Sequence, residues 1–212
     1  MKKALLLFSA GKESVYNLHK LYEEFGSEIT LLIFDYGQDS YSAELRSAIY
    51  YSEKFGIDVI ERDSTIVMPD AMRYGGVGET EVPFRNGIFT SYAVNIAVSQ
   101  GFTHVCIGCT DSGDYGDGDR EFVSAFNTLL QGMYDVEIIS YTKNYTGVEI
   151  AIKTLSEDID DSHIWSCMTS GEKMCGKCAK CLMIMGYYVD NLNTINPKYG
   201  DYLRKHYGLR TF

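Results

Sequence analysis

Lys3-Ala-Leu-Leu-Leu-Phe8, with Ser9-Ala-Gly-Lys-Glu-Ser14 directly after it, is the stretch that decides the fold. The first part is a short apolar run, which is typical of a buried β-strand. The second part is small and polar, and it leads into Glu13–Phe25, which has the spacing of an amphipathic helix. A strand that turns at once into a helix predicts the first half of a strand–helix–strand unit, from which parallel sheets are built.

The same alternation continues along the chain. Further apolar runs predict strands at Ile29–Phe34, Ile57–Ile60, His104–Gly108 and Val136–Tyr141. Helical spacing is found between them, at Ser42–Phe55, Gly87–Ser99 and Glu121–Leu130. This pattern predicts an α/β fold with a five-stranded parallel sheet and helices on both faces. Ligands bind such sheets outside the carboxyl ends of the strands. We therefore expect Ser9–Ser14, Tyr36–Ser40 and Asp111–Asp119 to lie along one rim.

The chain divides into two unequal parts. Residues 1–153 carry the strand–helix alternation and form the expected α/β domain, with one irregular stretch at Asp63–Pro83. Strand patterns stop after about Lys153, and residues 154–212 are expected to form a small helical appendage packed on the body. A helix near Tyr199–His206 would close it. A length of 212 residues fits one domain with such an addition.

Composition excludes several classes of protein. No apolar run approaches the roughly 20 residues that span a bilayer. The net charge of −10 argues against stable binding to nucleic acid, which needs clustered Lys and Arg. Six cysteines without a secretory signal indicate a reducing compartment, where thiols bind metal or fill cores. We expect a cytoplasmic protein with a small-molecule ligand and no membrane contact.

Four cysteines predict a metal site. Cys167, Cys175, Cys178 and Cys181 contain two C-x-x-C pairs, which can surround one tetrahedral zinc ion in a structural role. An iron–sulfur cluster stays open, because four cysteines serve it equally well. The remaining pair, Cys106 and Cys109, ends an apolar strand, which favours packing over a redox role.

The turn Ser9–Ser14 predicts a phosphate-binding loop. Its small residues let a phosphate approach the backbone, and the start of the helix offers free N–H groups and positive potential. Ser9 and Ser14 add hydroxyl groups, and Lys12 adds a charge. The loop is not a Walker A motif, because Leu6 stands where that motif has its first glycine. A plain strand–helix turn capped by serine stays open at this point.

Five motifs follow one another along the chain. The first three are Ser9-Ala-Gly-Lys-Glu-Ser14, Phe34-Asp-Tyr-Gly-Gln38 with Glu44-Leu45 behind it, and Val82-Pro-Phe-Arg-Asn86. The last two are Tyr115-Gly-Asp-Gly-Asp-Arg-Glu-Phe122, and Trp165-Ser-Cys167 with Cys175-Gly-Lys-Cys-Ala-Lys-Cys181. Together they resemble the motifs of the 7-cyano-7-deazaguanine synthase (QueC-type) family of PP-loop ATP pyrophosphatases, of which the chain is identified as a divergent member. Ala10 and Glu13 replace a glycine and an aspartate of that family, and Gly118 and Asp119 replace a cysteine and an arginine.

The resemblance implies a fold like that of the adenine nucleotide alpha hydrolases, and an ATP-dependent carbon–nitrogen ligase. Such an enzyme adenylates the carboxylate of 7-carboxy-7-deazaguanine and converts it with ammonia to 7-cyano-7-deazaguanine (preQ0), in queuosine biosynthesis. AMP and pyrophosphate or phosphate are released. Two alternatives stay open. In one, the activated deazaguanine is joined to another amine, including a protein, as in antiviral or phage settings. In the other, the chain is a non-catalytic nucleotide-binding subunit. A homodimer also stays open.

The resemblance also assigns site residues. The expected catalytic residues are Lys12, Arg85 and Asp117. ATP is expected to contact Phe8, Ser9, Ala10, Gly11, Lys12, Glu13, Ser14, Tyr36, Gln38 and Asn86. The deazaguanine is expected to contact Asp111, Asp117, Glu121 and Phe122. Asp117 or Glu121 would accept from the two N–H donors of the guanine-like edge. Mg²⁺ would accompany ATP, held by another member of the acidic loop that contains Asp111, Asp114, Asp117 and Asp119.

Overall fold

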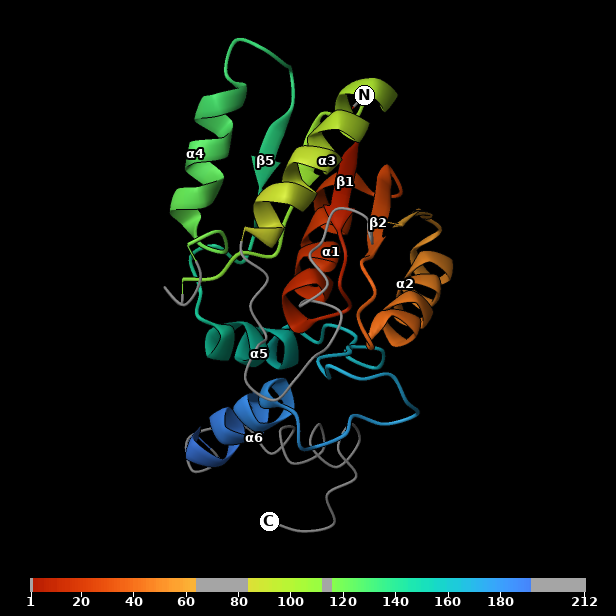
Figure 1. The fold of residues 1–212 in the computed structure, drawn as a ribbon, viewed down its shortest axis with the longest axis vertical. Coiled ribbons are helices and arrows are strands. Elements are labelled where there is room, and N and C mark those ends of the chain that lie inside the picture. Colours follow the sequence, from red (N-terminus) through yellow and green to blue (C-terminus); the bar gives the residue numbers. More distant parts are fainter. Residues whose placement is uncertain (1, 64–83, 112–115, 192–212) are drawn as a thin grey trace.

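The computed structural model of the chain describes residues 2–63, 84–111 and 116–191 (Figure 1). Its strands are β1 (Ala4–Leu7), β2 (Ile29–Asp35), β3 (Asp58–Asp63), β4 (His104–Cys106) and β5 (Glu137–Ile139). Its helices are α1 (Lys12–Phe25), α2 (Tyr41–Phe55), α3 (Arg85–Gln100), α4 (Arg120–Leu130), α5 (Gly147–Ser156) and α6 (Ala179–Asn191). The expected helix at Tyr199–His206, most of the irregular stretch Asp63–Pro83, and Asp114 lie outside the described residues.

The five strands form one parallel sheet in the order β3-β2-β1-β4-β5, which confirms the predicted fold class. β1 lies at the centre, where Ala4 is paired with Ile29 of β2 on one side and with His104 of β4 on the other. The chain winds outward from β1 in both directions. The carboxyl ends of β1 and β4 therefore flank the point where the strand order reverses, which is where open α/β sheets bind their ligands.

Alternate residues of the central strands point to opposite faces of the sheet. Ala4 and Leu6 belong to a buried cluster with residues of α1, α2 and α5. Leu5 and Leu32 belong to a second cluster, with residues of α3 and α4. Both clusters are apolar because each strand is covered on both sides, which explains the unbroken hydrophobic runs in the sequence.

Strand ends differ by a few residues from the predicted ends. β3 extends to Asp63, which pairs with Asp35, because an edge strand tolerates polar residues that the apolar pattern does not reveal. β4 is shorter than expected and ends at Cys106. Three residues later the Cys109 N–H donates to the Ile107 carbonyl at 3.2 Å, so the chain turns there. β5 also stops early, because the Tyr141 N–H donates to a side chain of α1 rather than to a strand.

The C-terminal part lies beyond the carboxyl ends of the strands, below the sheet in Figure 1. α5 begins with a capping box, in which Thr146 and Glu149 each bond the other's backbone N–H. Ile150 of this helix enters the core beside α1, while Ala151 packs in a small cluster with Cys167 and Cys181. The domain boundary expected after residue 153 falls within α5, so this helix touches both parts and the boundary stays a prediction. No described helix combines the length and the apolar character needed to cross a membrane.

Asn17 holds α1 against the end of the sheet. Its side chain is fully buried, accepts from the Tyr141 N–H at 2.7 Å, and donates to the Thr142 hydroxyl at 3.0 Å and the Glu13 carbonyl at 2.9 Å. Buried polar groups that lose their partners carry the full cost of their removal from water. This one side chain therefore fixes the start of α1 relative to the segment after β5.

We expect Asn17→Ala to lower the free energy of unfolding by about 1–3 kcal/mol, because it leaves buried partners unsatisfied. Urea unfolding followed by circular dichroism measures the loss. Asn95→Ala, on the exposed side of α3, is the matched control and should change stability by about 0.5 kcal/mol or less. Equal urea midpoints of unfolding for the two variants would show that the Asn17 hydrogen bonds make no net contribution to stability.

Candidate active site and metal centre

The predicted phosphate loop lies between β1 and α1, at the carboxyl edge of the sheet. Ala10 is buried and has a left-handed backbone (φ +57°), while Gly11 precedes the first turn of the helix. The Ser14 hydroxyl donates to the Gly11 carbonyl at 2.9 Å and so stabilises the turn from within. Ser9 is exposed. The backbone N–H groups of the first helical turn have no partner within the helix, which makes this end suited to an anion.

Lys12 and Glu13 form an ion pair at the mouth of the loop. Lys12 is only 8% exposed, and its ammonium lies close to Gly147 at the start of α5. Burial by itself raises the pKa of the Glu13 carboxyl, but the charge and hydrogen bond of Lys12 outweigh burial and lower this pKa below its usual value. Glu13 therefore stays ionised and keeps Lys12 at the loop.

Phe8 lies in the core rather than at the loop surface. Its ring meets Tyr51 edge to face, with 5.9 Å between the ring centroids, and its side chain is 3% exposed. Only the backbone of Phe8 is therefore placed to contribute to a ligand site. Its N–H is already bonded to the Leu32 carbonyl at 2.9 Å.

The segment after β2 brings Tyr36 and Gln38 to the same edge. Gln38 accepts from the Tyr36 N–H at 2.9 Å and donates to the Phe34 carbonyl at 2.9 Å and to Glu44 at 3.2 Å. The Arg85 guanidinium donates to the Tyr36 hydroxyl at 3.2 Å and lies over its ring, 5.6 Å from the centroid. Burial raises the pKa of Tyr36 although Arg85 opposes the shift, so the phenol remains a neutral partner. Two predicted site residues, Tyr36 and Arg85, thus meet across segments far apart in the sequence.

The acidic loop divides into groups with different surroundings. Asp117 accepts from the Asn86 N–H at 2.9 Å, and its carbonyl accepts from the Asn86 side chain at 2.9 Å. Asp117 therefore contacts the start of α3 through Asn86, the residue that follows Arg85 in the sequence. Asp119 caps α4 by accepting from the Phe122 N–H at 2.9 Å. Asp111 is exposed, and its N–H donates to the Tyr145 carbonyl at 2.9 Å.

Glu121 and Phe122 lie away from the phosphate loop. Glu121 is exposed and pairs with Arg120 at 2.8 Å, and this bond lowers its pKa. Glu121 lines a surface cavity of about 770 Å³ between α4 and β5, which is lined by no phosphate-loop residue. Phe122 is 8% exposed and packs against Phe126, with ring centroids 5.0 Å apart. Of the four residues expected to contact the deazaguanine, Asp117 forms hydrogen bonds with Asn86, a residue expected to contact ATP.

One charged residue at this edge was missed by the sequence analysis. Lys180 lies in the first turn of α6, between two cysteines, and interacts electrostatically with Arg85, Glu44, Glu13 and Lys12. Desolvation, and after it the charge of Arg85, lowers the pKa of the Lys180 ammonium. No local pattern of the sequence indicates that Lys180, between two predicted metal ligands, would interact with Arg85 and Lys12.

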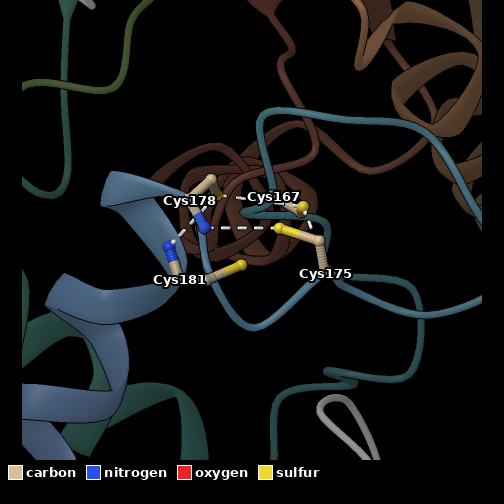
Figure 2. Close-up of side chains that lie close together, drawn as sticks. All are labelled: Cys167, Cys175, Cys178 and Cys181. Atoms are coloured by element: carbon tan, nitrogen blue, oxygen red, sulfur yellow. Dashed lines mark hydrogen bonds between the residues drawn. The ribbon is translucent and has the colours of Figure 1, made fainter. Parts of the chain in front are cut away.

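The four C-terminal cysteines converge, as Figure 2 shows. Their sulfur atoms all lie within 4.8 Å of one another, and those of Cys167 and Cys178 are 3.9 Å apart. Backbone N–H groups donate to three of these sulfurs: Cys175 to Cys167 at 3.3 Å, Cys178 to Cys175 at 3.3 Å, and Cys181 to Cys178 at 3.5 Å. The donor set and spacing fit one structural metal ion.

The local backbone prepares one of these thiols, Cys175, for a metal. Burial by itself raises the pKa of the Cys175 thiol, but hydrogen bonds from the backbone of Lys177 and Cys178 outweigh it and lower the pKa to about 6. A thiolate is the form that binds metal. Cys106 and Cys109 differ, because burial raises the pKa of both thiols, that of Cys109 to about 12. These two fill the core as the sequence analysis expects.

Comparison with known proteins agrees with the motifs. The sequence model of the family described as "Queuosine biosynthesis protein QueC" matches residues 3–189. The 7-cyano-7-deazaguanine synthase of Aliarcobacter butzleri is 29% identical over 201 residues, which cover 85% of this chain and 88% of the relative. The 7-cyano-7-deazaguanine synthase of Pseudoalteromonas translucida is 31% identical over 212 residues, which cover 90% of this chain and 96% of the relative.

A solved structure supports the same fold. The U34-tRNA thiolase NcsA from Methanococcus maripaludis, determined with its [4Fe-4S] cluster, superposes with a TM-score of 0.55. The alignment covers 99% of this chain and 74% of the thiolase at 15% sequence identity. At this identity the likeness concerns the fold, a parallel α/β body of the PP-loop type.

We expect the purified chain to carry one metal ion, which Cys178→Ser abolishes, because three thiolates leave the tetrahedral site incomplete. Colorimetric metal release measures the stoichiometry. The fluorescence of Trp165, the single tryptophan, should change on release because it packs against the cysteine cluster. Cys109→Ala is the control and should keep the metal. Equal metal content in the two variants would contradict the assignment.

Proposed function

Because this chain belongs to the QueC family, we propose that it is an ATP-dependent ligase that converts 7-carboxy-7-deazaguanine and ammonia into 7-cyano-7-deazaguanine. The observation that carries the proposal is the position of the phosphate loop with Lys12 at the point where the strand order reverses, together with the hydrogen bond that joins Asp117 to Asn86, the neighbour of Arg85, at the start of α3. The groups that would bind phosphate, and the carboxylate that would accept hydrogen bonds from the substrate, would then lie at one edge of the sheet, as the reaction requires.

A carboxylate is a poor acyl donor, so its conversion needs a leaving group. In the proposed reaction the substrate carboxylate attacks the α-phosphate of ATP, and pyrophosphate leaves with its electron pair on oxygen. Ammonia then attacks the acyl adenylate and releases AMP, which gives the amide. A second ATP activates the amide oxygen, and loss of that oxygen yields the nitrile. The protein contributes orientation and charge stabilisation.

The phosphate loop would hold the departing pyrophosphate. Ser9, the N–H groups at the start of α1, and Lys12 supply donors and positive charge, while the buried Ser14 hydroxyl keeps the loop in shape. Gln38 shapes the neighbouring loop, and its own hydrogen bonds bring Tyr36 toward Arg85. Mg²⁺ bound with ATP would neutralise phosphate charge. Asp111, exposed at the same edge, is the candidate carboxylate for that ion.

Arg85 and Asp117 would orient the two ends of the deazaguanine. Arg85 is suited to the carboxylate or the α-phosphate, because its planar guanidinium binds such groups through two parallel hydrogen bonds. Asp117 is suited to the guanine-like edge, where it accepts from two adjacent N–H donors. The two residues are joined through Asn86, which follows Arg85 in sequence and bonds Asp117. The spacing between the two ends of the ligand would thus be set by the start of α3.

We propose zinc as the metal of the four-cysteine site. Tetrahedral zinc with Zn–S bonds of about 2.3 Å places its sulfurs roughly 3.8 Å apart. The 3.9 Å between the sulfurs of Cys167 and Cys178 and the 4.8 Å limit for all four support this ion. A four-iron cluster would lie between its cysteines and push the sulfurs further apart. Elemental analysis of anaerobically prepared protein distinguishes the two.

We expect the protein to form AMP and pyrophosphate from ATP only when 7-carboxy-7-deazaguanine is present, because adenylation needs the carboxylate as nucleophile. Anion-exchange chromatography of the nucleotides and a pyrophosphate assay measure this. ADP and orthophosphate as the sole products would overturn the mechanism. Mass spectrometry of the base product then separates a nitrile from an amide or a protein adduct, and the nitrile is expected.

We expect Asp117→Asn to weaken the apparent affinity for the deazaguanine about tenfold, the loss of 1–2 kcal/mol that an unpaired donor costs. The asparagine oxygen can still accept from the Asn86 N–H, so the start of α3 should be preserved. Glu121→Gln is the matched control and should stay within about twofold, because this exposed side chain lines a separate surface cavity. Substrate titration of AMP formation measures both. Equal affinities would mean that the base is read elsewhere.

A further inference from the structure

Three cations from distant parts of the chain interact electrostatically beside the phosphate loop. Lys12 starts α1, Arg85 starts α3, and Lys180 stands in the first turn of α6. Lys180 interacts electrostatically with both of the others. Its side chain is exposed, and within the described ranges its ammonium forms no hydrogen bond or ion pair. Among the described residues, its ammonium is therefore available to an anion at this edge of the sheet.

Contacts independent of charge fix the position of Lys180. The Trp165 N–H donates to the Ala10 carbonyl of the phosphate loop at 2.8 Å. The Ser170 N–H donates to the Asp39 carbonyl at 3.0 Å, and its hydroxyl accepts from the start of α2 at 3.2 Å. Cys181, next in sequence to Lys180, is fully buried. The segment that carries the four cysteines is thus hydrogen-bonded to both loops that border the site. Its backbone places Lys180 at that border.

Cations gather around Lys180 although the chain as a whole is acidic, with a net charge of −10. Two carboxylates, Glu13 and Glu44, face the three cations. Glu13 is paired with Lys12, and Glu44 accepts from the Ser40 hydroxyl at 2.6 Å and from Gln38. Among these five groups, both carboxylates thus have other hydrogen-bond or ion-pair partners than Lys180. Positive charges that lie close together repel one another, and an anion that binds among them reduces this repulsion.

We propose that Lys180 binds the pyrophosphate part of ATP opposite the phosphate loop, so that the metal-binding segment contributes a side chain directly to the nucleotide site. This inference rests on the proposed ATP-dependent function. Pyrophosphate is favoured over the single carboxylate of the second substrate because it carries several charges and many acceptor oxygens, enough to engage three separated cations. The metal then has a role beyond local folding, since it holds the turn on which Lys180 stands.

Binding of inorganic pyrophosphate to the full-length, metal-loaded protein tests the proposal. Isothermal titration calorimetry at low salt should show that Lys180→Ala binds about tenfold more weakly than the wild type, the effect of one charge-assisted hydrogen bond. Lys180→Arg should remain within about threefold, because the charge and donors are kept. Lys177→Ala is the matched control on the same turn and should stay within about twofold, since it removes the same charge from an exposed position outside the cluster.

Equal binding by Lys180→Ala and Lys177→Ala overturns the proposal, as does a wild type that forms AMP yet does not bind pyrophosphate. Metal content is measured for each variant, and if Lys180→Ala loses the ion, Lys180→Gln takes its place in the comparison. Failure of the proposed function looks different. In that case the wild type forms no AMP with the deazaguanine, while the difference between the Lys180 and Lys177 variants persists.

Discussion

The pairing of β1 on both of its edges is the constraint on which the rest of the molecule depends. Ala4 pairs with Ile29 and with His104, so the first strand is the central one and the chain must wind outward twice. A shift of one residue in this register would exchange the Ala4 and Leu6 face with the Leu5 face and expose the wrong side chains to each helix layer. The correct register also places Ser9 where the strand order reverses. The phosphate loop is therefore positioned by sheet pairing, before any ligand contact is made.

The loop is also held from the C-terminal side. Ala10 has a left-handed backbone, which costs a residue with a side chain about 1–2 kcal/mol. Its carbonyl accepts from the Trp165 N–H, and its methyl group is fully buried in the core. These contacts offset the strain at a position where glycine would adopt the conformation freely. The metal-binding segment and the phosphate loop thus stabilise each other, although they lie at opposite ends of the chain.

The acidic loop shows how similar residues acquire different roles from their surroundings. Asp119 serves the fold by capping α4, and Glu121 forms an exposed ion pair with Arg120. Asp117 contacts the start of α3 and, through it, the neighbourhood of Arg85. A dense run of carboxylates is electrostatically unfavourable in isolation. Here the helix starts, which carry partial positive charge, relieve part of that repulsion.

The sequence by itself determined the order along the chain of the five strands and of the helices α1 to α4, the parallel sheet, the loop after the first strand, and the four-cysteine cluster, but it did not indicate α5 or α6. Each feature that it determined depends on residues close in sequence or on strict periodicity. Only the tertiary structure decided that Phe122 lies in the core, that Glu121 faces a separate cavity, and that Lys180 joins Lys12 and Arg85. These outcomes depend on which segments dock against one another, and docking is settled by packing and backbone hydrogen bonds between residues more than a hundred positions apart, such as Trp165 and Ala10. No local pattern of residue types encodes such a contact.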